Sequence, residues 1–258
     1  MYFYFYDKFT QDPKYEVVLT NVETKLIDLG INGRIEKLSI FKNARELIED
    51  GIKKGAHTVV AVGDDKTFAN VVNIVAPFDV TLGFIPIVEG SRFAEVLGMP
   101  VGEEACLTLS RRLYEAVDLG QVDDMYFLGS LTLPPHKNLQ MKCDDMYSVA
   151  TTAETNEVRI VNLGEIVGVD EIRLGAGTDG RIDLMISPVV ENGLFRRGKK
   201  QGDYKESVFP AEKIAIDAGA ENLALSADGA FTVTTPCDVV AAPGALKVIV
   251  GRERLLKS

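Results

Sequence analysis

The sequence has few of the residues that build disulfide frameworks, zinc sites or nucleic-acid-binding surfaces. It contains only three cysteines and two histidines. Because the cysteines are far apart and form no CxxC pair, neither a disulfide framework nor a zinc site is predicted. Acidic residues outnumber basic ones by 38 to 28, for a formal net charge of −10. A protein that coats nucleic acid needs clustered Lys and Arg to neutralise phosphates, so we expect no nucleic-acid partner.

Two local features stand out against this background, and both have simple interpretations. The basic residues within 196–200 are typical of a solvated loop. His57 and His136 each lack a second histidine or a cysteine nearby, so we expect structural roles for both. Neither feature predicts a metal or nucleic-acid site.

Long apolar runs are also absent. The apolar run at 2–6 is far too short to span a bilayer. It has neither the basic region nor the cleavage site of a signal peptide. We therefore expect no transmembrane segment, and the unpaired cysteines favour the reducing cytoplasm.

The composition is that of a folded globular protein. Hydrophobic residues make up 46% of the chain and charged residues 26%, which are ordinary values for a protein with a packed core. A length of 258 residues lies between one large domain and two modest ones. We expect two domains.

Residues 1–113 alternate between strand and helix patterns. The predicted strands are 2–6, 34–40, 57–63 and 82–86, and the predicted helices are 16–29, 44–54, 68–75, 93–97 and 103–113. Strands separated by helices predict a doubly wound parallel sheet, an α/β domain.

Residues 114–258 lose the helical period. Short strand-like runs replace it, at 115–117, 125–131, 157–163, 182–186, 213–218, 223–226 and 247–251. This pattern predicts a predominantly β, sandwich-like second domain, with the last strands free to return to the first domain.

The turn after the third predicted strand is the most informative stretch. An apolar strand at 57–63 runs into Asp64, Asp65, Lys66 and Thr67, and a helix follows. Backbone N–H groups at a helix N-terminus, together with the helix dipole, favour a phosphate at this place. In open α/β sheets, ligands bind at the carboxyl ends of the strands. The alternative is a simple capping turn, since Asp and Thr cap helices well.

Gly63-Asp64-Asp65-Lys66-Thr67 resembles the G-G-D-G-T phosphate loop of the superfamily of diacylglycerol kinases, sphingosine kinases and NAD kinases. Two of the motif's glycines are replaced, by Asp64 and Lys66. Asp64 adds a negative charge beside a phosphate, a repulsion of about 1 kcal/mol or more. Lys66 offers a compensating point charge.

A second stretch, 82–100, is similar to the family's L-G-x-I-P-x-G-T-x-N-D-F-A-R-x-L-G-I-P. It keeps Pro86 and the F-A-x-x-L-G-x-P end, but Val88, Glu89 and Ser91 stand where the family has Gly-Thr and Asn. The resemblance implies a nucleotide site between the two domains. Its expected residues are Ser39, Gly63, Asp64, Asp65, Lys66, Thr67, Glu89, Gly90 and Ser91.

Weaker matches extend into the second half. Residues 178–185 resemble the D-D-G-x-L-D-L segment that holds a structural magnesium in the bacterial lipid kinases, which makes Asp179 the expected metal ligand. Residues 228–230 resemble the D-G-E motif, but Ala230 replaces the Glu that is the family's proposed general base. Asp228 and Asp65 are the remaining candidate catalytic residues. A displaced carboxylate at 118, 123 or 124 is the alternative base.

The resemblance implies a lipid-kinase-like protein of the bacterial branch. If active, it would need ATP and Mg²⁺, a lipid or other small alcohol as acceptor, and a base that the sequence does not identify. Loss of a general base lowers a rate by about 10²- to 10⁴-fold, so the changes favour a catalytically impaired protein. The alternatives are a non-catalytic regulatory or small-molecule-binding protein and an NAD kinase-like enzyme, although that group's N-E dipeptide is absent. A homodimer is compatible with all three.

Overall fold

The computed structural model describes residues 1–40, 42–151, 156–167, 172–188 and 206–256. They form two compact units, Met1–Val117 with Gly244–Ser258, and Asp118–Pro243. The sequence prediction divided the chain at 113/114 and left the return of the last strands open. In the structure, the chain after residue 243 belongs to the first unit. The basic residues of 196–200 lie outside the described residues.

The first unit is built on a parallel sheet, as predicted. Its strand order is β2-β1-β3-β4-β18, and each neighbouring pair in this order runs parallel. The strands are β1 (Tyr2–Tyr6), β2 (Arg34–Lys37), β3 (Thr58–Gly63) and β4 (Thr81–Pro86), joined by the end of β18 (Cys237–Ile249). All four carboxyl ends of β1 to β4 therefore meet at one edge.

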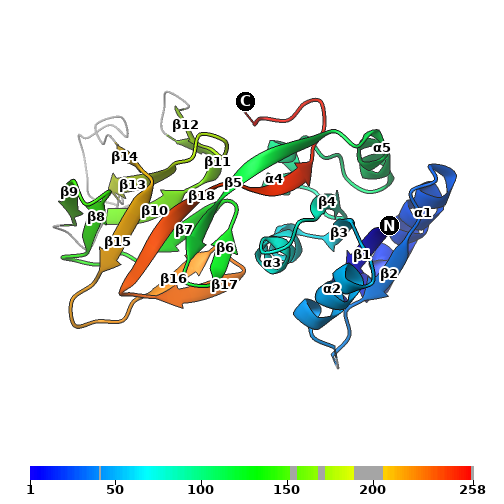
Figure 1. Ribbon diagram of the computed structural model, residues 1–258, viewed down its shortest axis with the longest axis horizontal. Helices are drawn as coiled ribbons and strands as arrows, with labels where there is room; N and C mark the ends of the chain where they lie inside the picture. Colours follow the sequence, from blue (N-terminus) through cyan, green and yellow to red (C-terminus); the bar gives the residue numbers. More distant parts are fainter. Residues whose placement is uncertain (41, 152–155, 168–171, 189–205, 257–258) are drawn as a thin grey trace, which may run out of the picture. The chain divides into compact units, whose positions relative to one another are not determined.

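Among the described residues of this unit, five α-helices and two short 3-10 helices accompany these strands. They are η1 (Lys8–Gln11), η2 (Pro13–Tyr15), α1 (Glu16–Asp28), α2 (Ala44–Lys53), α3 (Asp65–Val75), α4 (Arg92–Leu97) and α5 (Glu103–Arg111). Helices α2, α3 and α4 pack in sequence along one face, whereas on the other face α5 packs on β4 and α1 packs on α5 (Figure 1). The α/β prediction is thus confirmed.

Close approach of helix to strand requires glycine at two positions. A Cβ on Gly51 of α2 would lie 2.5 Å from the ring of Phe3 in β1. A Cβ on Gly83 of β4 would lie 2.7 Å from the side chain of Leu109 in α5. The sheet is therefore sandwiched tightly between two helical layers.

The core beside the carboxyl edge is aromatic. Phe68 of α3 is fully buried and its ring stacks on Phe84 of β4 with centroids 4.5 Å apart. It also contacts the ring of Phe93 of α4, at 5.5 Å. One side chain thus fixes the distance between the helix that follows β3 and the helix that follows β4.

The strands that the structure describes in the second unit pair antiparallel. One sheet has the order β14-β13-β10-β7-β16-β17, a second continues β18-β15-β8-β9, and β11 pairs with β12. Its strands are β5 (Tyr114–Val122), β6 (Met125–Phe127), β7 (Ser130–Leu133), β8 (Gln140–Cys143), β9 (Tyr147–Ala150), β10 (Asn156–Val161), β11 (Leu163–Val167), β12 (Ile172–Ala176), β13 (Ile182–Pro188), β14 (Ser207–Ala211), β15 (Lys213–Asp217), β16 (Ala224–Ala227) and β17 (Phe231–Thr234).

One apolar core joins the two larger sheets of this unit. Leu131, Ile160 and Leu184 from the first sheet belong to the same buried cluster as Met141 and Ile214 from the second. The predicted β-rich, sandwich-like domain is confirmed. The predicted run 125–131 is in fact two strands, and β8, β9, β11, β12, β14 and β17 were not predicted.

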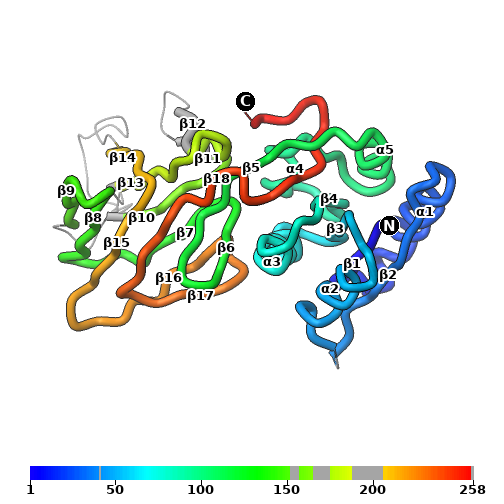
Figure 2. The backbone as a smooth tube through the Cα atoms, viewed as in Figure 1, coloured from blue at the N-terminus to red at the C-terminus, as the bar shows by residue number. Residues whose placement is uncertain are grey.

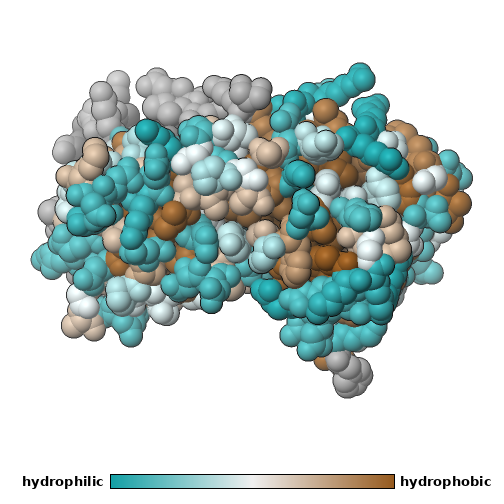
Figure 3. Space-filling model, in the orientation of Figure 1, coloured by the Kyte–Doolittle hydropathy of each residue, from teal (hydrophilic) through white to brown (hydrophobic). Residues whose placement is uncertain are grey.

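The chain passes out of the first unit in β5 and returns in β18, as the tube trace shows (Figure 2). Among the described residues, no helix combines the length and the apolar character needed to cross a membrane. Exposed large apolar side chains include Val17, Ile27 and Met146, and the face drawn in Figure 3 is mixed, with hydrophilic residues over much of it and hydrophobic patches over its right-hand part.

We predict that Phe68→Ala lowers the free energy of unfolding by about 3–5 kcal/mol, because it leaves a cavity between α3, β4 and α4. Urea denaturation followed by circular dichroism measures this change. Val17→Ala is the matched control: its side chain is 73% exposed, and we expect a change within about 0.5 kcal/mol. A Phe68→Ala protein as stable as this control would contradict the packing described.

Candidate functional site

The carboxyl edge of the parallel sheet gathers the predicted nucleotide residues of the first unit. Asp7 follows β1, Ser39 follows β2, Gly63 ends β3, and Glu89 to Ser91 follow β4. Parallel register places these strand ends side by side. Ligands bind at this edge in open α/β sheets, so we take it as the candidate site.

Asp64 caps α3 from inside the turn. Its backbone is extended, and its Oδ1 accepts a hydrogen bond of 2.9 Å from the Thr67 N–H. Asp side chains at this position stabilise helices because they satisfy a donor that has no partner within the helix. The structure therefore places a carboxylate, supplied by the chain itself, on an amide that the resemblance assigns to a phosphate.

Thr67 ties this cap to the first strand. Its side chain is 1% exposed, and its hydroxyl lies 2.9 Å from Asp64 Oδ1 and 3.0 Å from Asp7 Oδ2. One hydroxyl proton serves two carboxylates, so Thr67 donates to one of them at a time. Gly63 must be glycine here, since a Cβ would lie 2.4 Å from the Thr67 Oγ1.

Asp65 links the turn to α4. Its carboxylate accepts hydrogen bonds from the Ser91 hydroxyl and from the Arg92 N–H, the latter at 2.9 Å. Ser91 is itself the N-cap of α4, and its Oγ accepts from the Ala94 N–H at 3.0 Å. The ends of β3 and β4 are thus joined by one hydrogen-bonded chain.

Lys66 is the one residue of the turn with an exposed side chain. Within the described part of the chain it makes no ion pair, and the backbone N–H groups of Asp65 and Lys66 donate to no side chain there. An anion approaching the turn can therefore reach these two amides and the Lys66 ammonium. It would also face the carboxylates of Asp64 and Asp65.

The remaining predicted residues of this edge take no part in the hydrogen-bonded chain that joins β3 and β4. The Ser39 carbonyl accepts from the Lys42 N–H at 3.2 Å, whereas Glu89 and Gly90 are exposed. Asp7 was not predicted, although it bonds Thr67 directly. The available signal was its place as the first acidic residue after an apolar strand.

Asp228, a candidate catalytic residue, belongs to the second unit and holds a loop there. Its carboxylate accepts three backbone N–H groups, from Leu128 at 2.8 Å, Gly129 at 3.0 Å and Ser130 at 2.7 Å. Ala230 lies in the turn between β16 and β17, where its N–H donates to the Ala227 carbonyl at 2.9 Å. This geometry explains the break between β6 and β7, because the amides of the break are turned toward Asp228.

Asp179, the expected metal ligand, also belongs to the second unit. Its exposed side chain accepts from the Arg181 N–H at 3.1 Å. Burial raises the pKa of nearby Asp183, the Gly175 N–H opposes the rise, and the charge of Asp179 adds to it. No group of three His, Cys, Asp or Glu side chains in the described ranges is arranged to hold a metal ion. The donors present do not fit a metal site, and the assignment of Asp179 stays a prediction.

Two of the three alternative base residues, Asp118 and Asp123, also have structural roles. Asp118 is 3% exposed, and its Oδ2 accepts from the Gly180 N–H at 2.7 Å. Asp123 has a positive φ of 51° in the turn between β5 and β6. Both residues therefore have a role in the local geometry of the second unit.

We predict that Asp228→Ala destabilises the protein by about 3 kcal/mol or more, because three amides lose their acceptor and each unsatisfied group costs about 1–3 kcal/mol. Urea unfolding measures this loss. Asp217→Ala is the matched control, since Asp217 accepts one exposed hydrogen bond, from the Gly219 N–H at 2.8 Å, and we expect a loss below about 1 kcal/mol. Equal stability of the two variants would refute the structural role of Asp228.

Comparison with known proteins gives consistent matches. Residues 3–122 match the family model "Diacylglycerol kinase catalytic domain". A "Probable lipid kinase YegS-like" of Pseudomonas aeruginosa is 30% identical over 92 residues, 35% of this chain and 30% of that protein. A "Diacylglycerol kinase" of Bacillus subtilis is 38% identical over 75 residues, 28% of this chain and 25% of that protein. The matched region thus spans less than a third of the length of either relative.

A solved structure of a diacylglycerol kinase has the same fold as this chain. The crystal structure of a diacylglycerol kinase from Bacillus anthracis superposes with a TM-score of 0.76 at 16% identity, over 97% of both chains. At this identity the likeness concerns the fold. Both units of the present chain therefore have equivalents in that protein.

Proposed function

We propose that this chain, a member of the superfamily of diacylglycerol kinases and YegS-like lipid kinases, keeps the kinase fold but is catalytically impaired. The observation that carries the proposal is the position of Asp64. Its carboxylate occupies the Thr67 amide and lies at hydrogen-bonding distance from the Thr67 hydroxyl. A phosphate group that used these donors would first have to displace a charged side chain of the protein.

Electrostatics oppose a nucleotide at this turn. Two like unit charges at 4 Å repel by about 1 kcal/mol in water and by about 4 kcal/mol near a protein surface. Asp7, Asp64 and Asp65 place three carboxylates around the turn, and Lys66 supplies one exposed cation. The balance favours weak binding of a triphosphate, held by Lys66 and the free amides of the turn.

The second unit supports impaired phosphate transfer independently. In the family pattern, the third residue of D-G-E is the proposed base, and this chain has Ala230. Asp228 is held by three backbone amides, which makes it a poor substitute. A missing general base lowers the rate by about 10²- to 10⁴-fold.

The partners of this proposal follow from the relatives. Their names point to lipid kinases, so a nucleotide and a lipid or other small alcohol remain the proposed ligands, with ATP and Mg²⁺ if any activity survives. A non-catalytic regulatory or small-molecule-binding role is the form of the proposal that best fits a closed turn, that is, a turn at 63–67 whose Thr67 amide is already bonded to Asp64. The named relatives give no support to the NAD kinase alternative.

We predict that the wild-type protein binds Mg-ATP only weakly in isothermal titration, without reaching saturation at millimolar nucleotide. Asp64→Gly removes the charge and restores the family's glycine, and we expect at least about tenfold tighter binding, the equivalent of about 1.4 kcal/mol of relieved repulsion. Stability falls by only a few tenths of a kcal/mol, because glycine is tolerated at an N-cap.

Asp64→Asn is the matched control for this experiment, because it keeps the cap and removes only the charge. We expect it to bind Mg-ATP with an affinity between those of the wild type and Asp64→Gly. Micromolar Mg-ATP binding by the wild type, or transfer of phosphate from ATP to diacylglycerol at a rate that Asp64→Gly does not increase, would contradict the proposal.

A further inference from the structure

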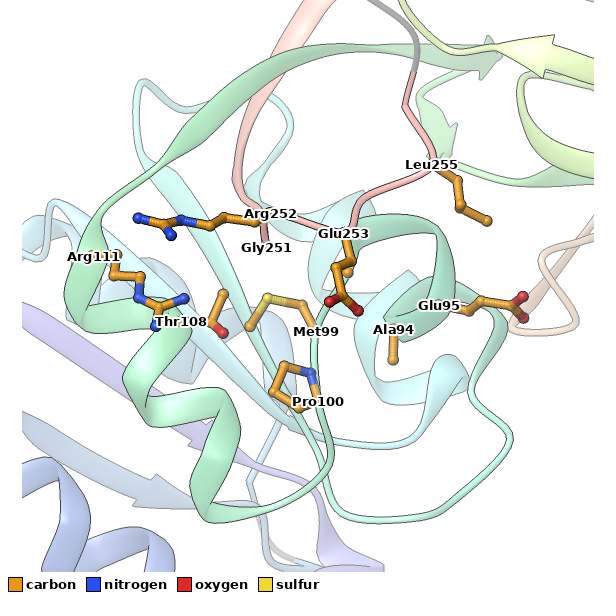
Figure 4. Close-up of a pocket in the computed structure, with 11 residues that line it drawn as sticks. Ala94, Glu95, Met99, Pro100, Thr108, Arg111, Gly251, Arg252, Glu253 and Leu255 are labelled. Carbon is orange, nitrogen blue, oxygen red and sulfur yellow. The ribbon is translucent and has the colours of Figure 1, made fainter.

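The first unit contains a pocket that shares no residue with the candidate nucleotide site. Its volume is about 510 Å³, within the range of small-molecule sites. Three segments line it: α4 with the loop after it, the second half of α5, and the chain after β18 (Figure 4). Every lining residue belongs to the first unit.

The last segment of the chain forms one wall of this pocket. The Gly251 N–H donates to the Leu97 carbonyl at 2.8 Å, and the Leu255 N–H donates to the Val96 carbonyl at 2.9 Å. Gly251 approaches Gly98 so closely that a Cβ would lie 1.8 Å from the Gly98 oxygen. These contacts hold the turn that carries Arg252 against the end of α4.

Two arginines of the lining have no partner within the described part of the chain. Arg111 and Arg252 make neither a hydrogen bond nor an ion pair there, although both line the pocket. Two other arginines of this unit are paired, Arg34 with Glu36 at 2.7 Å and Arg254 with Glu115, whereas Arg112 lies over the Tyr2 ring. Both arginines are exposed, and two guanidinium groups beside one pocket can bind an external anion.

Thr108 adds a polar group at the same end of the pocket. Its residue is 6% exposed, and its hydroxyl has no hydrogen-bond partner among the described residues. Figure 4 shows the Thr108 side chain between the Arg111 guanidinium and Met99. An anion bound between the arginines would accept a hydrogen bond from this hydroxyl.

The rest of the lining limits the size and shape of the ligand. Met99 and Pro100 give an apolar wall beside Thr108, whereas Glu253 and Glu95 lie toward the opposite side (Figure 4). An extended polyanion would meet these carboxylates. A compact dianion with a small neutral or cationic remainder would not.

We propose that this pocket binds a small phosphomonoester, with its phosphate between Arg111 and Arg252 and accepting a hydrogen bond from the Thr108 hydroxyl. Guanidinium groups match phosphate oxygens in geometry as well as charge. The site does not depend on the turn at Gly63–Thr67, so it holds whether or not that turn binds nucleotide.

Isothermal titration of the full chain with inorganic phosphate, glycerol 3-phosphate and acetate tests this proposal. We expect saturable binding of glycerol 3-phosphate, weaker binding of phosphate and little binding of acetate. Arg111→Gln and Arg252→Gln should each weaken glycerol 3-phosphate binding about tenfold or more, and Thr108→Val about three- to tenfold. Urea unfolding of each variant verifies that it is folded.

Two control variants separate this site from general charge effects and from the nucleotide turn. Arg45→Gln removes an exposed arginine of the same unit that pairs with Glu49 at 3.7 Å, and it should leave the affinity unchanged. Lys66→Ala should do the same. The proposal is overturned if the wild type does not bind glycerol 3-phosphate at 10 mM, roughly the weakest binding expected of a two-arginine site. It is also overturned if Lys66→Ala abolishes binding while Arg111→Gln and Arg252→Gln do not change it.

Discussion

The hydrogen bond between the Asp64 carboxylate and the Thr67 amide is the contact on which the first unit's functional edge depends. It begins α3, and the Thr67 hydroxyl extends it to Asp7 at the end of β1. Asp65, next in the chain, extends it to the N-terminus of α4. Three strand ends and two helices are thereby fixed around one turn.

This interaction also decides what the edge can do chemically. The first amides of a helix have no partner within the helix, so they can hold either a side chain of the protein or an external anion. In this chain Asp64 holds the Thr67 amide, which raises the local negative charge at the place where the family pattern binds phosphate. Under the proposed function, the Asp64 carboxylate therefore both caps α3 and opposes a nucleotide phosphate at the same amide.

Much of the first unit could be predicted from local patterns. The β-branched run at 57–63 predicted a central parallel strand, and Thr58–Gly63 is one. The helix after it was predicted from residue 68, but it begins at Asp65, because the cap at Asp64 adds one turn that apolar periodicity does not reveal. The sequence placed Asp7 at a strand end but not beside Thr67, since the residues are 60 apart in sequence and only sheet order brings them together.

The second unit was harder to predict because its strands are short and its key contacts join residues far apart in sequence. Short strands such as Gln140–Cys143 carry too few residues for an alternating pattern to stand out. Asp228 bonds amides 98 to 100 residues away, so its structural role depends on strand pairing. The D-G-A sequence alone indicated a changed catalytic motif. It did not indicate that the neighbouring carboxylate holds a loop.

The most direct test of the account is the NMR signal of the Thr67 amide, followed during an acid titration and then during addition of Mg-ATP at neutral pH. If Asp64 holds this amide, its proton shift changes with the same midpoint as the Asp64 carboxyl carbon, and millimolar Mg-ATP leaves it in place. A Thr67 amide that ignores the titration of Asp64 but moves to saturation with Mg-ATP would contradict the closed turn.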